Sequence, residues 1–70
     1  MPSAHRGRVT MFGGDGWGVV TAESGVAYPF HCTAVSDGSR TIPVDSAVTF
    51  TVVAGRQGRW EASALALLSG

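Results

Sequence analysis

The sequence predicts a small all-β protein, a five-stranded antiparallel β-barrel, from three observations. Short segments in which apolar and polar residues alternate recur along the chain, and this period of two is typical of half-buried strands. Turn residues separate these segments at regular spacing, with 10 glycines among 70 residues. No segment carries the periodicity of a long amphipathic helix. A chain of this length forms one domain with a small core.

The first two expected strands form a hairpin. Residues 8–12 alternate in polarity, and residues 17–22 continue the pattern with Trp17, Val19 and Thr21 on one face. The residues between the two segments include three glycines. Because glycine has no Cβ to strain it at positive φ, this stretch can reverse the chain in a tight turn.

Three more strands complete the expected sheet. The third, at residues 27–32, contains Pro29, which cannot donate a backbone hydrogen bond and therefore indicates an edge strand. The fourth, at residues 47–53, alternates most clearly, with its Val48, Phe50 and Val52 side chains expected to face the core. The last strand is expected from Arg59 to about Leu65. The alanines and leucines that follow Trp60 also suit a helix, but a barrel needs a strand there to close its sheet.

Composition limits the classes of function and the compartment. The formal net charge is zero, with five acidic residues and five basic residues, all of them arginine. Because neutralising phosphates supplies much of the affinity for nucleic acids, this balance predicts weak binding at most. Residues 1–6 are polar, lack the apolar run of a signal peptide, and are expected to be a flexible N-terminus before a domain at residues 7–68. No segment approaches the length needed to span a bilayer, and the single cysteine suits a reducing compartment. We therefore expect a cytoplasmic protein with no membrane contact.

Catalytic and metal sites are not predicted, and no cofactor is expected. His31 and Cys32 are neighbours on an expected strand, where ordinary pleating sends them to opposite faces and out of hydrogen-bond contact. Two histidines and one cysteine give no cluster with metal-ligand spacing. The glycine-rich turn lacks the lysine and the following helix of a phosphate-cradling loop. A binding module, not an enzyme, is the expected class.

Two motifs resemble those of the bacterial cold-shock domain, a small barrel of the oligonucleotide-binding (OB) fold. Residues 16–19, Gly-Trp-Gly-Val, match the family's Gly-Phe-Gly-Phe motif. Residues 28–35, Tyr-Pro-Phe-His-Cys-Thr-Ala-Val, match its Val-Phe-Val-His-Phe-Ser-Ala-Ile motif. The similarity extends from Gly7 to about Leu65. It implies a partner, single-stranded RNA or DNA, and a role as an RNA chaperone or regulator.

The resemblance also implies which residues contact nucleic acid. Barrels of this type offer outward aromatic side chains on which bases stack, with basic side chains along the path of the backbone. Of the matching outward positions, only Trp17 and His31 carry a flat ring here, and the turn where the family has a lysine carries Asp15, which repels phosphate. The candidate nucleic-acid-binding residues are Arg8, Met11, Phe12, Trp17, Val19, His31, Arg56 and Arg59.

Two placements and one function remain open at the level of sequence. With His31 outward, Tyr28 and Phe30 point into the core, and a shift of one residue reverses all three. The frame with His31 outward is favoured. Trp60 alternates with small alanines and is favoured as a core residue over a second stacking surface. The alternative function is protein contact, as a homodimer or a docking subunit, because the outward residues Met11, Val19, Pro29 and Cys32 are uncharged and mostly apolar.

Overall fold

A computed structural model describes residues 4–35, 42–55 and 58–68, and these residues form five strands and one short 3₁₀ turn. The elements are β1 (His5–Phe12), β2 (Trp17–Ala22), β3 (Ala27–His31), the turn η1 (Cys32–Ala34), β4 (Ala47–Ala54) and β5 (Trp60–Leu67). Neighbouring strands are antiparallel and follow the order β3-β2-β1-β4-β5. The predicted all-β, five-stranded antiparallel class is confirmed.

The ends of the sheet differ slightly from the expected ranges. β1 begins at His5, which pairs with Phe50 of β4, so it starts inside the segment expected to be flexible. β5 is a strand as far as Leu67, and the helical alternative for this segment is therefore wrong. The described residues include no helix with the length and apolarity that a membrane crossing needs.

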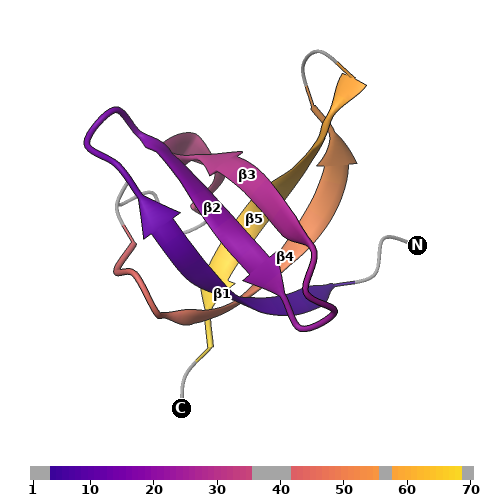
Figure 1. The fold of residues 1–70 in the computed structure, drawn as a ribbon, viewed down its shortest axis with the longest axis horizontal. Coiled ribbons are helices and arrows are strands. Elements are labelled where there is room, and N and C mark those ends of the chain that lie inside the picture. Colours follow the sequence, from indigo (N-terminus) through magenta and orange to yellow (C-terminus); the bar gives the residue numbers. More distant parts are fainter. Residues whose placement is uncertain (1–3, 36–41, 56–57, 69–70) are drawn as a thin grey trace.

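The sheet curls until its two edge strands, β3 and β5, lie close to each other (Figure 1). Within the described residues, one isolated parallel bridge, between Val35 after η1 and Leu65 in β5, links the two edges. The molecule is thus barrel-like, and the residues that the structure describes form no continuous hydrogen-bonded ladder between β3 and β5. Pro29 lies in edge strand β3, as its missing N–H predicts.

The core fills the inside of the curl. Its largest fully buried side chains are Phe30, Phe50, Leu65, Val9, Val20 and Val48. Along β4, Val48 and Phe50 are buried and Val52 packs against the same cluster, which confirms the expected inward face. No polar side chain of the described residues is buried, so packing of apolar groups provides the stability of this small domain.

The register of β3 follows from a close approach between two strands. Gly18 of β2 pairs with Phe30 of β3, and a Cβ on Gly18 would lie 2.6 Å from the ring atom Cζ of Phe30. Only glycine leaves room for this ring, which is fully buried. Tyr28 packs against the same core, and His31 pairs with Trp17 on the other face. The frame with His31 outward is confirmed.

A bulge in β1 changes the alternation that a regular strand would show. Val9 pairs with Val20 but Met11 pairs with Val19, so Thr10 is an extra residue in the ladder. Both Thr10 and Met11 are consequently exposed, and Phe12 returns to the inner side. There its ring stacks on that of Phe30, with centroids 6.0 Å apart. Phe12, expected among the residues that contact nucleic acid, instead packs against the core.

The expectation that Trp60 fills the core is wrong, because its side chain is 62% exposed. Trp60 begins β5 and pairs with Ala54, the last residue of β4. Figure 1 shows that this end of the β4–β5 hairpin projects beyond the body of the barrel. A residue at this position therefore has no core to enter, whatever its hydrophobicity.

A second bulge, in β5, places an alanine in a strained conformation. Between the pairs Thr49–Ala66 and Thr51–Ser63, β5 has one residue more than β4. Ala64 lies in this bulge with φ of 52°, in the left-handed region where bulges usually carry glycine. The extra residue turns Leu65 inward, where it is 1% exposed.

Replacing Ala64 with glycine should stabilise the protein. Relief of a left-handed alanine is worth about 1–2 kcal/mol, and the greater freedom of glycine in the unfolded chain returns about 0.4–1 kcal/mol of this. We expect Ala64→Gly to raise the free energy of unfolding in urea by about 0.5–1 kcal/mol. Ala62→Gly is the control, because Ala62 is buried in the same strand, and it should lower stability by about 1 kcal/mol. Destabilisation by both variants would contradict the strain at Ala64.

Candidate nucleic-acid interface

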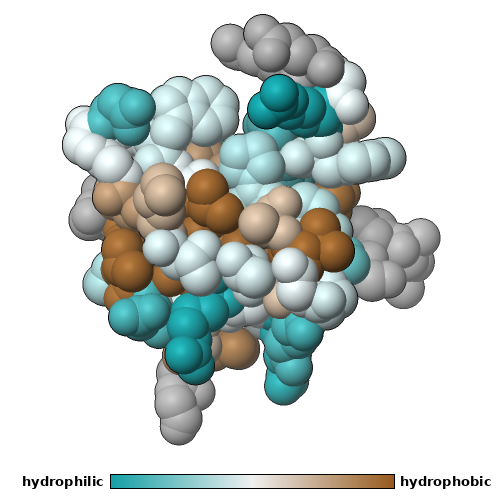
Figure 2. All heavy atoms as spheres, in the orientation of Figure 1, coloured by the Kyte–Doolittle hydropathy of each residue, from teal (hydrophilic) through white to brown (hydrophobic). Residues whose placement is uncertain are grey.

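The outer face of β1, β2 and β3 carries a row of apolar and aromatic side chains. Trp17 pairs with His31, Val19 pairs with Pro29, and Met11 pairs with Val19 on its other side. Because directly paired residues point to the same face of a sheet, these five side chains share one surface, which we call the outer platform. Figure 2 shows apolar side chains gathered across the middle of this face, with hydrophilic side chains around them.

The two rings of the outer platform are in contact. The ring centroids of Trp17 and His31 are 4.9 Å apart and their planes meet at 71°, an edge-to-face arrangement. Trp17 remains 43% exposed and Met11 61% exposed. The expectation that Trp17 and His31 lie side by side on the outside of the sheet is confirmed.

Local hydrogen bonds fix the orientation of His31. This residue caps η1, and its Nδ1 atom accepts from the backbone N–H of Thr33 at 3.3 Å. The hydroxyl of Thr33 lies 2.9 Å from the same nitrogen. Because a backbone N–H only donates, the neutral imidazole has its proton on Nε2. His31 therefore presents Nε2–H as a hydrogen-bond donor.

The predicted separation of His31 and Cys32 is wrong. β3 ends at His31 and the chain turns into η1, so pleating no longer applies to the next residue. The Cys32 sulfur lies 3.9 Å from Nδ1 of His31 as a result. In the described part of the chain, no group of three or more His, Cys, Asp or Glu side chains is placed to hold a metal ion.

Asp15 borders the platform for a structural reason. Its Oδ1 atom accepts a hydrogen bond from the backbone N–H of Trp17 at 3.1 Å, which closes the turn of the β1–β2 hairpin. The next residue, Gly16, has φ of 88°, which side chains rarely adopt. Asp15 also lines a shallow hollow with Met11 and Val19. The turn thus places a carboxylate at this end of the platform.

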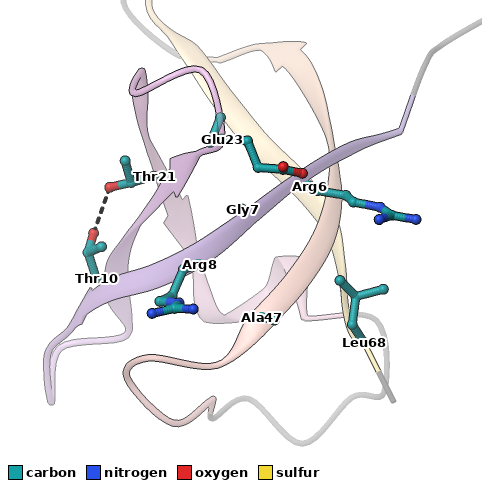
Figure 3. A pocket seen from close by; sticks show the side chains of 9 residues that line it. Arg6, Gly7, Arg8, Thr10, Thr21, Glu23, Ala47 and Leu68 are labelled. Carbon is teal, nitrogen blue, oxygen red and sulfur yellow. Dashed lines mark hydrogen bonds between the residues drawn. The ribbon is translucent and has the colours of Figure 1, made fainter. Parts of the chain in front are cut away.

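Basic side chains lie at the other end of the same face. Arg8 of β1 pairs with Thr21 of β2, next to a contact of 3.0 Å between the hydroxyls of Thr10 and Thr21. These residues line a hollow, which Figure 3 shows from close by. In it, Arg8 lies on the side of the two threonine hydroxyls, and Glu23 lies near Arg6. We call it the arginine hollow; it is lined by Arg6, Gly7, Arg8, Thr10, Thr21, Ala22, Glu23, Ala47 and Leu68.

Arg59, the other predicted cation that the structure describes, is not part of this face. Arg59 is exposed in the β4–β5 hairpin, where its carbonyl accepts from the N–H of Gly55 at 2.7 Å. It lines neither the outer platform nor the arginine hollow. Arg56 lies outside the described residues. Of the predicted cations, Arg8 alone is placed beside the platform within the described residues.

Sequence reasoning missed two residues that border the face. Arg6 was assigned to the N-terminus, whereas it belongs to β1 and lines the arginine hollow. Glu61 lines another hollow, together with Trp17, His31 and Thr33. In the sequence, the one feature that could have pointed to Glu61 is its position next to Trp60. This position becomes informative when the two edges of the sheet are known to lie close together.

Comparison with known proteins adds no assignment. No protein-family model matches the chain, and no curated protein matches it. The resemblance to the cold-shock domain therefore stays a prediction that depends on two short motifs.

The turn that holds Trp17 gives a testable expectation for Asp15. Removing the acceptor in Asp15→Ala should lower the free energy of unfolding by about 0.5–1.5 kcal/mol, the net contribution of one hydrogen bond. Asp15→Asn keeps an acceptor oxygen and a residue suited to turns, so its stability should stay within about 0.5 kcal/mol of the parent. Urea unfolding measures both. An equal loss in the two variants would mean that the charge, and not the acceptor, stabilises the turn.

Proposed function

We propose that this protein binds single-stranded nucleic acid, RNA or DNA, on the outer platform, in the manner of a cold-shock domain. The observation that carries the proposal is the contact between the Trp17 and His31 rings on the outer face of a curled five-stranded sheet. Flat exposed rings stack on unpaired bases, and each stacked base is worth about 1–3 kcal/mol with little dependence on sequence. The exposed thioether of Met11 extends the apolar surface beside them.

The charges around the platform support one orientation of the strand. Arg8 and Arg6 line the hollow at one end, and the carboxylate of Asp15 lies at the other. Phosphates favour the guanidinium groups and are repelled by a carboxylate. The backbone of a bound strand therefore runs toward the arginine hollow, while bases cover Trp17 and His31.

Weak binding suits the role that the resemblance implies. Two arginines, Arg6 and Arg8, line the hollow beside the platform, so the proposed strand releases few counterions and this contribution to affinity is modest. A surface that binds a few unpaired bases for a short time can open RNA secondary structure. Because the strand then dissociates, the RNA is not trapped in the open form. The proposed role is that of an RNA chaperone or regulator, and no catalytic step is assigned to the protein.

Trp17 should provide most of the binding energy. We expect Trp17→Ala to weaken binding of a fluorescently labelled oligothymidine by about 5- to 150-fold, which corresponds to the loss of one stacked base. Fluorescence anisotropy at low salt measures the affinity without relying on the tryptophan. Because Trp17 is on the surface, the far-ultraviolet circular dichroism spectrum, which reports the backbone fold, should not change.

Trp60 offers a matched control for this experiment. It is the other exposed tryptophan, and it lines a hollow with His5, Tyr28 and Val52 away from the outer platform. Trp60→Ala should keep both the fold and the oligothymidine affinity. Equal affinities for Trp17→Ala and the parent would refute the proposed surface.

The dependence on salt tests the role of the arginine hollow. Two phosphate contacts, to Arg6 and Arg8, predict that log K falls with log salt concentration with a slope of about −1.4, since each phosphate bound by a single strand contributes about −0.7. Arg8→Gln should reduce the slope to about −0.7. A slope near zero for the parent would exclude phosphate contacts at this hollow.

Protein contact on the same face is the second candidate function. It is favoured by the apolar hollow around Met11, which also includes Val19 and Pro29. An apolar centre with a polar rim, here including Asp15, is typical of protein interfaces. Absence of any oligonucleotide binding, together with light scattering that gives the mass of a dimer, would support this function and contradict the first.

A further inference from the structure

Two threonine hydroxyls lie in the arginine hollow, between the outer platform and Arg8, and base stacking does not use them. Thr10 of β1 and Thr21 of β2 both line the hollow, and their Oγ1 atoms are 3.0 Å apart (Figure 3). We propose that this hydroxyl pair recognises the ribose 2′-hydroxyl, so that the protein prefers single-stranded RNA to single-stranded DNA. The inference rests on the proposed binding of single-stranded nucleic acid and adds a preference for one sugar to it.

The hydroxyl pair lies where the sugar of a strand bound to this face would lie. Thr21 is on the same face of β2 as Val19 and Trp17. A strand rises about 3.3 Å per residue, so Thr21 is about 7 Å from Val19 and about 13 Å from Trp17 along β2. On β1, Thr21 is paired with Arg8. Apolar side chains, hydroxyls and a guanidinium group thus follow one another across the face, in the order of base, sugar and phosphate in a nucleotide.

A ligand can reach both hydroxyls from solvent. Thr10 is exposed because of the bulge in β1, and Thr21 is half-buried. On the other side of Arg8, the paired residue of β4 is Ala47, which is exposed. Because the side chain of Ala47 is a single methyl group, it leaves space beside the guanidinium group. The hollow therefore has room for a ribose and the phosphate that follows it.

The protons of the hydroxyl pair are already used within the protein. The hydroxyl of Thr10 donates to the carbonyl oxygen of Val19 at 3.4 Å, so the proton between the two hydroxyls comes from Thr21. Each hydroxyl oxygen keeps at least one lone pair, and no further donor among the described residues reaches either of them. The hydroxyl pair therefore offers acceptors to a ligand and needs a donor from it.

The ribose 2′-hydroxyl is the donor that matches these acceptors. Along the sugar–phosphate backbone of DNA, the phosphate and sugar oxygens only accept hydrogen bonds. RNA adds one hydroxyl per nucleotide, which donates as well as accepts and lets a protein distinguish the two nucleic acids. The C2′ methylene of DNA would displace water from the threonine oxygens and leave them without a donor, which costs free energy. Arg8 binds the adjacent phosphate in either nucleic acid, so it adds affinity without adding to the preference.

The first experiment changes only the sugar of the ligand. Labelled oligouridine, the same strand of deoxyuridine and a 2′-fluoro strand are titrated into the unmodified protein at low salt, and fluorescence anisotropy gives the affinity of each. We expect the RNA strand to bind about 3- to 10-fold more tightly than the deoxyuridine strand, the equivalent of one net hydrogen bond. The 2′-fluoro strand keeps an RNA-like sugar conformation but has no donor at this position, so it should bind as weakly as deoxyuridine.

The outcomes separate this preference from the proposed function. Equal affinities for the RNA and deoxyuridine strands would overturn the preference and leave the proposed function standing. Equal affinities for the RNA and 2′-fluoro strands would also overturn it, because the conformation of the sugar, and not its hydroxyl, would then set the preference. Absence of binding by all three strands would refute the proposed function itself and the preference with it.

Threonine variants assign the preference to the hydroxyl pair. Thr21→Val keeps the branched shape that suits a strand but removes the hydroxyl, so the RNA preference should fall to about twofold or less. Thr21→Ser restores a hydroxyl and should recover the preference. Thr51→Val is the control, because the hydroxyl of Thr51 donates to the carbonyl oxygen of Ser63 and lines neither the arginine hollow nor the hollow around Met11. Loss of the preference in Thr51→Val as well would contradict a contact at the hydroxyl pair.

Discussion

The passage of the Phe30 ring over Gly18 is the contact on which the outer platform depends. A Cβ at Gly18 would lie 2.6 Å from the ring and 2.7 Å from the carbonyl oxygen of Met11, so the ring occupies space that a side chain at position 18 would need. The ring of Phe12 stacks on the ring of Phe30 and contributes to the burial of Phe30. Because successive residues of a strand alternate between faces, burial of Phe30 sends His31 outward, opposite Trp17. A slip of one residue would expose the phenyl ring and bury the imidazole, at a cost of about 2 kcal/mol or more. The surface is thus positioned by the core beneath it.

Two bulges then adjust the strands that flank this contact. The extra residue at Thr10 shifts the alternation of β1 by one residue, so that Met11 points outward and Phe12 inward. Met11 thereby extends the platform, and Phe12 packs against Phe30. The bulge at Ala64 turns Leu65 into the core and lets β5 bend toward β3, where Val35 and Leu65 form the single described bridge across the seam. Bulges bend a strand and increase its twist, which a sheet of five short strands needs in order to curl. The left-handed alanine is the local consequence of that bend.

Charge is divided across the molecule in a way that the neutral total conceals. Arg6 and Arg8 lie along β1, whereas Asp15 and Glu61 border the two rings. Because the total charge is zero, the long-range field of the protein is weak, and the local charge differs along the outer face. Asp15 has a second role, since its carboxylate closes the hairpin turn that places Trp17. For the proposed single-stranded ligand, this distribution favours contacts to bases over general electrostatic attraction.

Local patterns in the sequence determined the strands, the β1–β2 hairpin, the edge position of β3 and the shared face of Trp17, Val19 and Thr21. Each of these follows from alternation, from glycine or from the missing N–H of proline, which act within a few residues. Only the tertiary structure decided where Phe12, Trp60, Cys32 and Glu61 lie. Phe12 depends on a bulge that alternation does not reveal, and Trp60 lies where the hairpin projects past the core. Cys32 and Glu61 depend on the end of β3 and on the approach of the sheet edges. Such placements follow from how the whole core closes, because a pattern of polarity specifies a face for each side chain but not the neighbour that it meets there.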